Sequence, residues 1–455
     1  MQQVNLGMLG GGTVGSGVFH AWQENGELMA ARLGVKLTFR KIAVQAFDEP
    51  RPYPIPHSLM TTDWQKVVND PQIHVVIELV GGTGIAKTMV LAALAQGKTV
   101  VTANKALLSA AGPELFAAAA RSGANLYYEA SVCGGIPIIK SLREGFVANE
   151  FPAIYGIVNG TCNYILTRMK HEGADFAAVL ADAQKQGYAE TPPDLDIDGR
   201  DAQHKTGILA SLAHGFWVDH HAIHTEGIRD VSKIDMQFAQ QLGYTIKLLG
   251  IVKKIADSRL KIDAAKRGAA RKSQIANRKS GVQVSVYPAL IPSSHLLADV
   301  NHVFNAVFVR GDVVGDTMFY GRGAGKDATA SAVLSDVADA ALDLKNGVKV
   351  RVPPFVAHAR NGRVTPMDEI VSEYYVRLSV VDRPGVLAKV AEVFAAAKIG
   401  ISSVIQPEGH EGESVPLILM LHDAPNAAMR KALDKISKLP VLKGKPVMFR
   451  VESFE

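Results

Sequence analysis

A short apolar run that leads directly into a glycine-rich segment is the feature that most limits how this chain can fold. Val4–Leu9 has the composition of a buried strand, and Gly10, Gly12 and Gly15 follow it with the spacing GxGxxG before a helix-like stretch. Such glycines allow a tight turn and let backbone N–H groups approach a pyrophosphate at a helix N-terminus. The position between a strand and a helix favours a dinucleotide-binding βα unit over an ordinary glycine-rich turn.

The first third of the sequence alternates strand-like and helix-like segments. Further strands are predicted at Leu37–Val44, His74–Val80, Lys98–Thr102 and Leu126–Glu129, and helices at Ile85–Ala95 and Pro113–Arg121, with the proline near a helix start. Strands separated by helices predict a parallel sheet with right-handed crossovers. We therefore expect an α/β protein whose residues 1–135 form a dinucleotide-binding domain with a Rossmann-type parallel sheet, completed by a return helix within 322–348.

Two further regions are expected after this sheet. Residues 136–321 predict a mixed α+β domain for catalysis, substrate binding and dimerisation, interrupted by a basic, weakly periodic insertion at 253–281 that we interpret as a surface segment. A linker rich in Pro and Gly spans 349–372. From 373 to 455 the pattern restarts in the order βαββαβ, which is the ferredoxin-like arrangement.

Composition argues against several classes of protein. The formal net charge is +5, but ten Lys and Arg against two Asp within 253–280 account for more than all of it. The rest of the chain is slightly acidic, which does not favour a nucleic-acid partner. No apolar stretch is long enough to span a membrane, so we expect no membrane partner. Two cysteines, Cys133 and Cys162, cannot form a disulfide framework and fit a reducing cytoplasm.

The polar run from Glu190 to Lys205 is the densest candidate for chemistry. Asp201 and Lys205 are four residues apart, so they would share one face of a helix. A lysine near a carboxylate can bind or transfer a proton, although surface ion pairs have the same spacing. Lys105 follows the strand at 98–102 and would lie at the carboxyl edge of the sheet, where ligands bind. From these residues alone, both catalytic and solvated roles stay open.

Other reactive side chains lack a supporting pattern. His220, His221 and His224 could bind a metal, but no pattern of carboxylates or thiolates accompanies them, so we favour structural or solvated roles. Cys162 could be a nucleophile, but no paired histidine is indicated, so we interpret it as a small packing residue.

The residue at the end of the second predicted strand usually determines whether such a domain binds NAD or NADP. A carboxylate there binds the ribose hydroxyls, and a nearby arginine accommodates a 2′-phosphate. Gln45 and Ala46 occupy this position, with Arg40, Lys41 and Arg51 close in sequence. We expect use of both dinucleotides with a lean towards NADP, because no carboxylate at that position repels a 2′-phosphate.

Several segments taken together carry a resemblance that none carries alone. The most specific motif comprises Ala183, Gly187, Tyr188, Ala189, Glu190, Pro193, Asp196, Ile197, Gly199, Asp201 and Lys205, with support from segments 101–107, 159–166 and 315–321. These residues resemble the homoserine dehydrogenase family over nearly the whole chain except the basic insertion. Pro192 departs from the Asp, Asn or Ser that is usual there. The turn 382–387 resembles the first strand-to-helix junction of an ACT domain.

The resemblance implies an NAD(P)H-dependent, reversible reduction of L-aspartate 4-semialdehyde to L-homoserine in threonine and methionine biosynthesis. It implies that Lys205 transfers the proton with Lys105 and Asp201 beside it, and that Glu190 and Asp201 bind the amino acid. The implied cofactor contacts are Gly10, Gly12, Thr13, Val14, Gly15, Lys105, Gly187 and Gly325. The implied site for sodium or another monovalent cation consists of Glu129, Val132, Gly134 and Ile136.

The resemblance of residues 373–455 to an ACT domain implies regulation. Such domains bind amino acids where two modules pair, so we expect threonine as a feedback effector and a homodimer or homotetramer. Two other functions stay open: another amino-acid dehydrogenase on the same fold, and a non-catalytic sensor of a dinucleotide and an amino acid.

Overall fold

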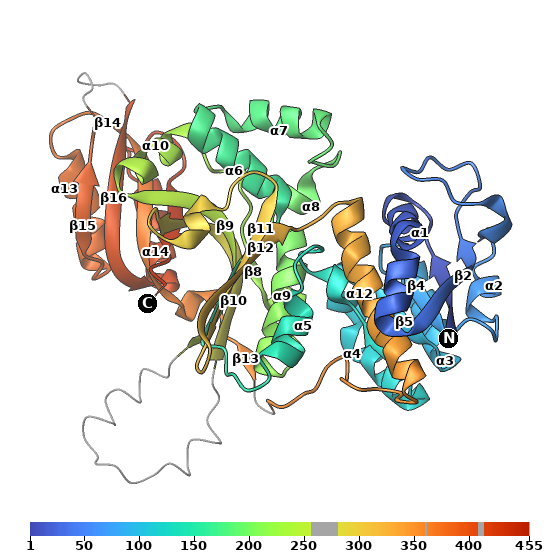
Figure 1. Ribbon diagram of the computed structural model, residues 1–455. Helices are drawn as coiled ribbons and strands as arrows, with labels where there is room; N and C mark the ends of the chain where they lie inside the picture. Colours follow the sequence, from blue (N-terminus) through green and yellow to red (C-terminus); the bar gives the residue numbers. More distant parts are fainter. Residues whose placement is uncertain (256–280, 360–361, 408–413, 455) are drawn as a thin grey trace, which may run out of the picture. The chain divides into compact units, whose positions relative to one another are not determined.

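The computed structural model describes residues 1–255, 281–359, 362–407 and 414–454 (Figure 1). The chain divides into two compact units. Unit 1 comprises residues 1–160, 204–221 and 304–362, and unit 2 comprises residues 161–203, 222–303 and 363–455. None of the helices within the described ranges has the length and apolar character needed to cross a membrane.

The larger sheet of unit 1 has six parallel strands. They are β1 (Gln2–Leu9), β2 (Val35–Ala43), β3 (Met60–Thr61), β4 (Val75–Glu78), β5 (Thr99–Thr102) and β6 (Leu126–Tyr127). Their order is β3-β2-β1-β4-β5-β6, and every neighbouring pair is parallel. This is the strand order of dinucleotide-binding sheets, in which ligands bind where the order reverses, here between β1 and β4. The predicted α/β fold class is confirmed.

Helices cover this sheet. They are α1 (Thr13–Leu33), α2 (Gln65–Val68), α3 (Ile85–Ala95), α4 (Lys105–Ser122) and α12 (Lys326–Lys345). The helices α1 and α12 lie side by side (Figure 1). Val333 and Val337 of α12 pack with Leu6 and Met8 of β1 in one core, and all four are fully buried. Helix α12, which comes from the last segment of unit 1, therefore completes the core of the N-terminal sheet.

Several predicted boundaries in unit 1 differ from the structure, and two of the wrong ones lie next to candidate site residues. Helix α4 begins at Lys105 and contains Pro113 in its interior, because the Asn104 side chain caps the helix by accepting a hydrogen bond from the Leu107 N–H at 3.0 Å. The last strand ends at Tyr127, and Glu129 instead starts a short 3₁₀ helix, Glu129–Ser131. The two-residue strand β3 was not predicted.

Unit 1 also contains three antiparallel strands and the greater part of α9. The strands are β7 (Ala153–Ile157), β11 (Phe304–Gly311) and β12 (Gly315–Arg322), with β11 between the other two. A short helix, α5 (Ile138–Lys140), precedes a π-helical turn at Ser141–Gly145. Helix α9 (Arg200–His214) starts in unit 2, and its residues from 204 onwards belong to unit 1.

Unit 2 contains a mixed sheet. Its main strands are β9 (Tyr244–Ile255), β10 (Gly281–Pro292), β17 (Val447–Val451), β14 (Val371–Val381), β16 (Ser414–Pro425) and β15 (Ile401–Ile405), in that spatial order. The strand β17 pairs parallel with β10 and antiparallel with β14. Two short strands, β8 (His224–Thr225) and β13 (Arg363–Val364), also pair with β10. Its helices include α6 (Gly160–Glu172), α7 (Phe176–Lys185), α8 (Asp194–Ile197) and α10 (Lys233–Gln241).

The C-terminal part of unit 2 has the predicted βαββαβ order. Its helices are α13 (Val386–Ala396) and α14 (Asn426–Ser437). Apolar side chains from both helices and from β14 and β16 form a separate buried cluster, which includes Leu378, Val390, Phe394, Leu419 and Ile436. The region therefore has its own core, although its last strand also pairs with β10.

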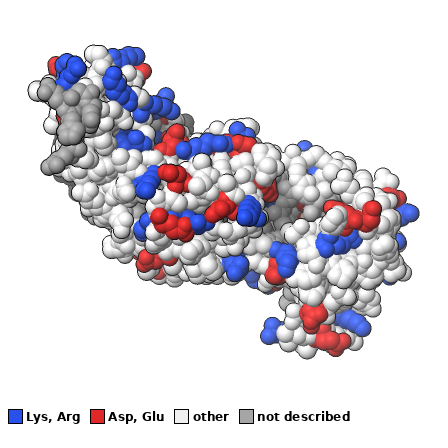
Figure 2. Space-filling model, turned by 90° about the horizontal axis from the view of Figure 1, so that it is seen from above, with Lys and Arg blue, Asp and Glu red and all other residues white. Residues whose placement is uncertain are grey.

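The predicted basic insertion 253–281 falls mainly outside the described residues. Its first residues continue β9 to Ile255, and Gly281 pairs with Ile255 as β10 begins. Residues 256–280, which hold most of the charge, are not described. On the face shown in Figure 2, Lys and Arg side chains are interspersed with Asp and Glu side chains.

Candidate active site

The three motif glycines of unit 1 have different surroundings, so a side chain would have a different effect at each of them. A Cβ on Gly10, which has a φ of +101°, would lie 2.7 Å from the carbonyl oxygen of Leu79. A Cβ on Gly15 would lie 2.1 Å from the carbonyl oxygen of Gly10, so the start of α1 approaches the turn too closely for any side chain. Gly12 meets only Glu49 Oε1, at 3.8 Å. The first and third glycines shape the turn, and the second borders open space.

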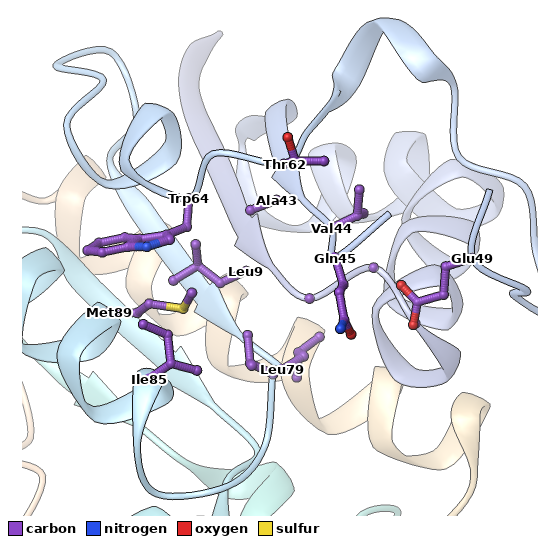
Figure 3. A pocket seen from close by; sticks show the side chains of 14 residues that line it. Leu9, Ala43, Val44, Gln45, Glu49, Thr62, Trp64, Leu79, Ile85 and Met89 are labelled. Carbon is purple, nitrogen blue, oxygen red and sulfur yellow. The ribbon is translucent and has the colours of Figure 1, made fainter. Parts of the chain in front are cut away.

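That space is a cavity of about 510 Å³ at the carboxyl ends of β1, β2 and β4. Its lining residues are Leu9, Gly10, Gly11, Gly12, Ala43, Val44, Gln45, Glu49, Thr62, Trp64, Leu79, Val80, Ile85 and Met89. Figure 3 shows Trp64, Ile85 and Met89 at one end, and Gln45 and Glu49 at the other. A largely apolar cavity with a few polar groups is typical of cofactor sites. Thr13 and Val14 are the first residues of α1, directly after Gly12.

A buried carboxylate organises the adjoining strand ends. Glu78, the last residue of β4, is fully buried. Its Oε1 accepts hydrogen bonds from the N–H groups of Val80 at 2.8 Å and Gly81 at 3.2 Å, while Oε2 accepts one from the Thr102 hydroxyl at 2.6 Å. Glu78 therefore fixes the loop that lines the cavity. Sequence analysis missed this role, although a glutamate that ends an apolar strand was a visible signal.

Lys105 is positioned by the same network. The Thr102 hydroxyl accepts a hydrogen bond from the backbone N–H of Asn104 at 3.0 Å, and the Asn104 side chain donates to the carbonyl of Gly82 at 2.7 Å. Lys105 then begins α4 at the carboxyl end of β5. The structure places it on the same sheet edge as the glycine turn, with one strand, β4, between β1 and β5.

Lys205 is buried, with 7% of its surface exposed. Its Nζ donates a hydrogen bond to the carbonyl of Val158 at 2.8 Å, just beyond the end of β7. Asp201 is half-buried and lies one turn earlier on α9. A single helix therefore carries both residues, and a backbone carbonyl holds the amine.

The remaining residues of the motif lie in unit 2. Glu190 has an exposed side chain, and its carbonyl accepts a hydrogen bond from the Gln184 side chain at 3.2 Å. Gly187 follows α7 with a φ of +73°, a conformation that favours glycine. Cys162 is buried and its thiol contacts the carbonyl of Asp196 at 3.2 Å, in keeping with its interpretation as a packing residue.

An arginine restrains the acidic part of this motif. The Arg229 guanidinium bonds to Asp194 and to Asp198 Oδ1, the latter at 2.5 Å. Its hydrogen bond lowers the pKa of Asp198, so this carboxylate stays ionised. These carboxylates are therefore paired with a cation of the protein, which explains part of the acidic run that the sequence left open.

The segment predicted to bind a monovalent cation is irregular and follows β6. Each carboxylate oxygen of Glu129 accepts a backbone N–H, from Ile139 at 2.9 Å and Lys140 at 2.7 Å. Burial raises the pKa of Glu129 to about 7, against these hydrogen bonds, which lower it. A Cβ on Gly134 would lie 3.2 Å from the carbonyl of Gly323, so the segment packs against the loop before α12. Gly325, with a φ of +111°, precedes that helix.

The histidines do not gather as a group of three. His224 Nε2 lies 2.7 Å from Glu226 Oε1. His220 and His221, together with Asp219, have possible ligand atoms within 4.8 Å of one another, at an exposed or half-buried position. Exposed groups of this kind are common without a metal, so the structure gives no reason to revise the structural or solvated interpretation.

Comparisons with known proteins agree over the whole chain. The model described as "Homoserine dehydrogenase, NAD binding domain" matches residues 10–129, the model "Homoserine dehydrogenase" matches 137–338, and the ACT domain model matches 374–440. A homoserine dehydrogenase from Neisseria gonorrhoeae is 38% identical over 100% of this chain and 99% of its own length. One from Pseudomonas aeruginosa is 39% identical over 99% of each.

Solved structures give the same result. The crystal structure of a homoserine dehydrogenase from Thiobacillus denitrificans is 38% identical, with a TM-score of 0.89 over 100% of this chain and 99% of that one. A hyperthermophilic archaeal homoserine dehydrogenase in complex with NADPH is 25% identical, with a TM-score of 0.59 over 75% of this chain and 98% of that one. The resemblance seen in the sequence is thus confirmed: the chain belongs to the homoserine dehydrogenase family, and it is an NAD-binding oxidoreductase with a C-terminal ACT domain.

Proposed function

We propose that Lys205 transfers the proton in the interconversion of L-aspartate 4-semialdehyde and L-homoserine, a step of threonine and methionine biosynthesis. Bound NADH or NADPH would supply the hydride for carbon 4 of the semialdehyde. The observation that carries the proposal is the position of Lys205. Its amine is buried and donates to the Val158 carbonyl, and the residue lies one helical turn after Asp201 on α9. A fixed amine can donate a proton to the developing alkoxide, and in the reverse direction it can accept one.

The other motif residues would orient the substrate. Glu190 and Asp201 offer carboxylates for the amino group of the amino acid, and Lys105 offers a second cation near the reacting oxygen. The proposed cofactor contacts are Gly10, Gly12, Thr13, Val14, Gly15, Lys105, Gly187 and Gly325. The cavity beside Gly12 and the N-terminus of α1 support the first five, because backbone N–H groups there suit a pyrophosphate.

Substitution of Lys205 tests the central role. Lys205→Met should reduce kcat for L-homoserine oxidation by roughly 100-fold or more, the usual scale for the loss of acid–base catalysis, with the affinity for NADH unchanged. The exposed Lys185→Met is the matched control and should retain full activity. Near-normal turnover in Lys205→Met would exclude Lys205 as the proton donor. A panel of amino-acid substrates would at the same time distinguish another amino-acid dehydrogenase, and inactivity towards all of them would favour a sensor.

The C-terminal region is proposed to bind threonine as a feedback effector. Support comes from the match of residues 374–440 to the ACT domain and from the separate core of this region. Regulation requires that the effector prefer one global state, typically by about 1–3 kcal/mol. L-threonine at millimolar concentration should inhibit the full-length enzyme, whereas D-threonine should not. Absence of inhibition, together with absence of binding heat in calorimetry, would reject the regulatory role.

Oligomer formation and a bound cation complete the proposal. Pairing of two C-terminal regions would give a homodimer or homotetramer, which sedimentation at several protein concentrations would detect. Glu129 with the carbonyls of Val132, Gly134 and Ile136 would hold sodium or another monovalent cation, because carbonyls and a carboxylate suit hard cations. Each oxygen of Glu129 accepts one backbone N–H, and a carboxylate oxygen has a second lone pair with which it could bind a cation. Replacing sodium by tetramethylammonium should lower activity, and Glu129→Gln should remove that difference.

A further inference from the structure

One charged side chain lines the cofactor cavity among the residues that the structure describes, and it is Glu49. The end of β2, where a carboxylate is usually decisive, carries Gln45 instead. Glu49 lies six residues beyond the end of that strand, on a loop that returns to the cavity. Figure 3 shows its carboxylate at the same end of the cavity as the Gln45 side chain.

The carboxylate borders the glycine turn. Its Oε1 lies 3.8 Å from the position that a Cβ on Gly12 would occupy. In sheets of this strand order the pyrophosphate lies at the N-terminus of the first helix, and the adenosine ribose lies beside it towards the end of the second strand. Glu49 therefore lies in the region that the ribose hydroxyls would enter, although the sequence position alone does not indicate it.

The loop that carries Glu49 is fixed at both ends. The Val44 N–H donates to the Thr61 carbonyl at 2.9 Å, which ties the start of the loop to β3. The ring of Tyr53 stacks on His20 of α1 with centroids 3.9 Å apart, and its hydroxyl accepts a hydrogen bond from Lys326 at 2.7 Å. A loop held in this way presents its side chains in a defined place before a ligand arrives.

The basic residues of this region do not line the cavity, although Arg51 bonds within the loop itself. The Arg51 guanidinium donates to the carbonyl of Ala46 at 3.1 Å and contacts the sulfur of Met60 at 3.0 Å. Arg40 pairs with Asp70 at 3.4 Å. Neither arginine is among the residues that line the cavity, and Lys41 is not either. A 2′-phosphate at this end of the cavity would meet a carboxylate without a lining cation to offset it.

We propose that Glu49, assisted by Gln45, accepts hydrogen bonds from the adenosine ribose hydroxyls and makes the enzyme prefer NAD(H) to NADP(H). The proposal rests on the cofactor site proposed above. A carboxylate is the usual partner of the ribose diol. A 2′-phosphate carries a charge of about −1.5 to −2 near neutral pH, so the same carboxylate repels it. The lean towards NADP expected from the sequence assumed that no carboxylate was present, and Glu49 removes that premise.

The test measures the affinity of the enzyme for each of the two cofactors, separately from catalysis. Titration calorimetry of the full-length enzyme with NADH and with NADPH, without amino-acid substrate, gives two dissociation constants. The wild-type protein should bind NADH at least about tenfold more tightly. The isosteric Glu49→Gln removes the charge, so it should reduce this ratio by about tenfold, mainly through tighter NADPH binding. Asp48→Asn is the matched control, because this neighbouring carboxylate is exposed and outside the cavity, and the ratio should stay as in the wild type.

Equal affinities in the wild-type protein, or an unchanged ratio in Glu49→Gln, would overturn the proposal. The same ratio shift in Asp48→Asn would also overturn it, because the effect would then come from general surface charge. The oxidation of L-homoserine with each cofactor keeps the two proposals distinguishable. Preferential NADH binding without homoserine oxidation would support the role of Glu49 and reject the proposed reaction, while activity with equal use of both cofactors would do the opposite.

Discussion

Arg450 and Glu226 form a two-pronged ion pair within unit 2, with Nη1 2.9 Å from Oε2 and Nη2 3.0 Å from Oε1. Arg450 belongs to β17 and is 1% exposed. The residues after Glu226 pack directly on the acidic motif, since a Cβ on Gly227 would lie 2.1 Å from the carbonyl of Ile197 and the Ile228 N–H donates to that carbonyl at 2.8 Å. The last strand is therefore linked through one pair to the segment before α9.

Removal of this arginine should destabilise unit 2. Arg450→Met leaves the Glu226 carboxylate with His224 but without its arginine partner, and it loses the stacking of the guanidinium on Tyr287, whose ring centre is 4.6 Å away. Glu226 is partly exposed, so the expected loss is about 2 kcal/mol, between the values for surface and buried pairs. Urea unfolding measures it. The exposed pair of Lys438 with Asp434 is the control, and Lys438→Met should change the midpoint little.

The same pair predicts a pH dependence. Burial would raise the pKa of Glu226, but the His224 hydrogen bond and the Arg450 charge outweigh it and lower this pKa to about 2. A carboxyl group with a depressed pKa in the folded state stabilises the protein above its unfolded pKa of about 4.3, and this contribution is lost as the pH falls towards 2. The stabilisation of wild type relative to Glu226→Gln, measured as the difference in urea midpoint, should thus shrink as the pH falls below 4. A difference that grows below pH 4 would contradict the assignment.

Glu78 should act on the cofactor cavity without touching the substrate. Thr102→Val removes the hydroxyl that donates to Glu78 and accepts the Asn104 N–H, so the loop at 79–82 and the start of α4 lose a shared anchor. We expect a loss of about 1–3 kcal/mol in stability, the cost of an unmade buried hydrogen bond, and weaker NADH binding. Thr102→Ser keeps the hydroxyl and should restore both. If NADH affinity is unaffected in Thr102→Val, Glu78 has only a structural role.

Substitutions of the second and third glycines of the motif should have different effects, one on cofactor binding and the other on folding. Gly15→Ala places a methyl group 2.1 Å from the Gly10 carbonyl, so the protein should lose stability or fail to fold. Gly12→Ala meets no backbone atom, so its melting temperature should stay close to that of the wild type. Its methyl group nevertheless enters the cofactor space, and the dissociation constant for NADH should rise by about tenfold or more. Calorimetry and thermal unfolding on the same preparations decide between these outcomes.

Continuous apolar runs explain why most of the N-terminal sheet was predictable. Strands that are buried on both faces need an apolar side chain at every position, as in Val75–Ile77 of β4 and at Val100 and Val101 of β5. The two residues of β3, Met60 and Thr61, carry no such pattern. The sequence does not predict the early start of α4, because a proline more often marks the first turn of a helix than its ninth residue, although Asn104 caps this helix.

The positions of candidate residues were predictable where a motif fixes them locally, as in the glycine turn before α1 or the shared helix of Asp201 and Lys205. The contacts of Glu78 and Glu49 were not predictable, because they join residues far apart in the sequence, although a carboxylate in an apolar run is itself a visible signal at Glu78. Glu78 binds the Thr102 hydroxyl 24 residues away. Glu49 approaches Gly12 from a loop whose Tyr53 stacks on His20. Loop conformation of this kind depends on tertiary contacts, which spacing does not encode.

The place of β17 between β10 and β14 affects how the protein is made. The strands β10 and β14, which pair with residues 447–451, are translated well before them. These two strands cannot be joined through β17 until residues 447–451 have been made. A premature stop codon just before Val447 would therefore delete an inner strand of the sheet. Such a product should expose the unpaired edges of β10 and β14, which are prone to aggregate.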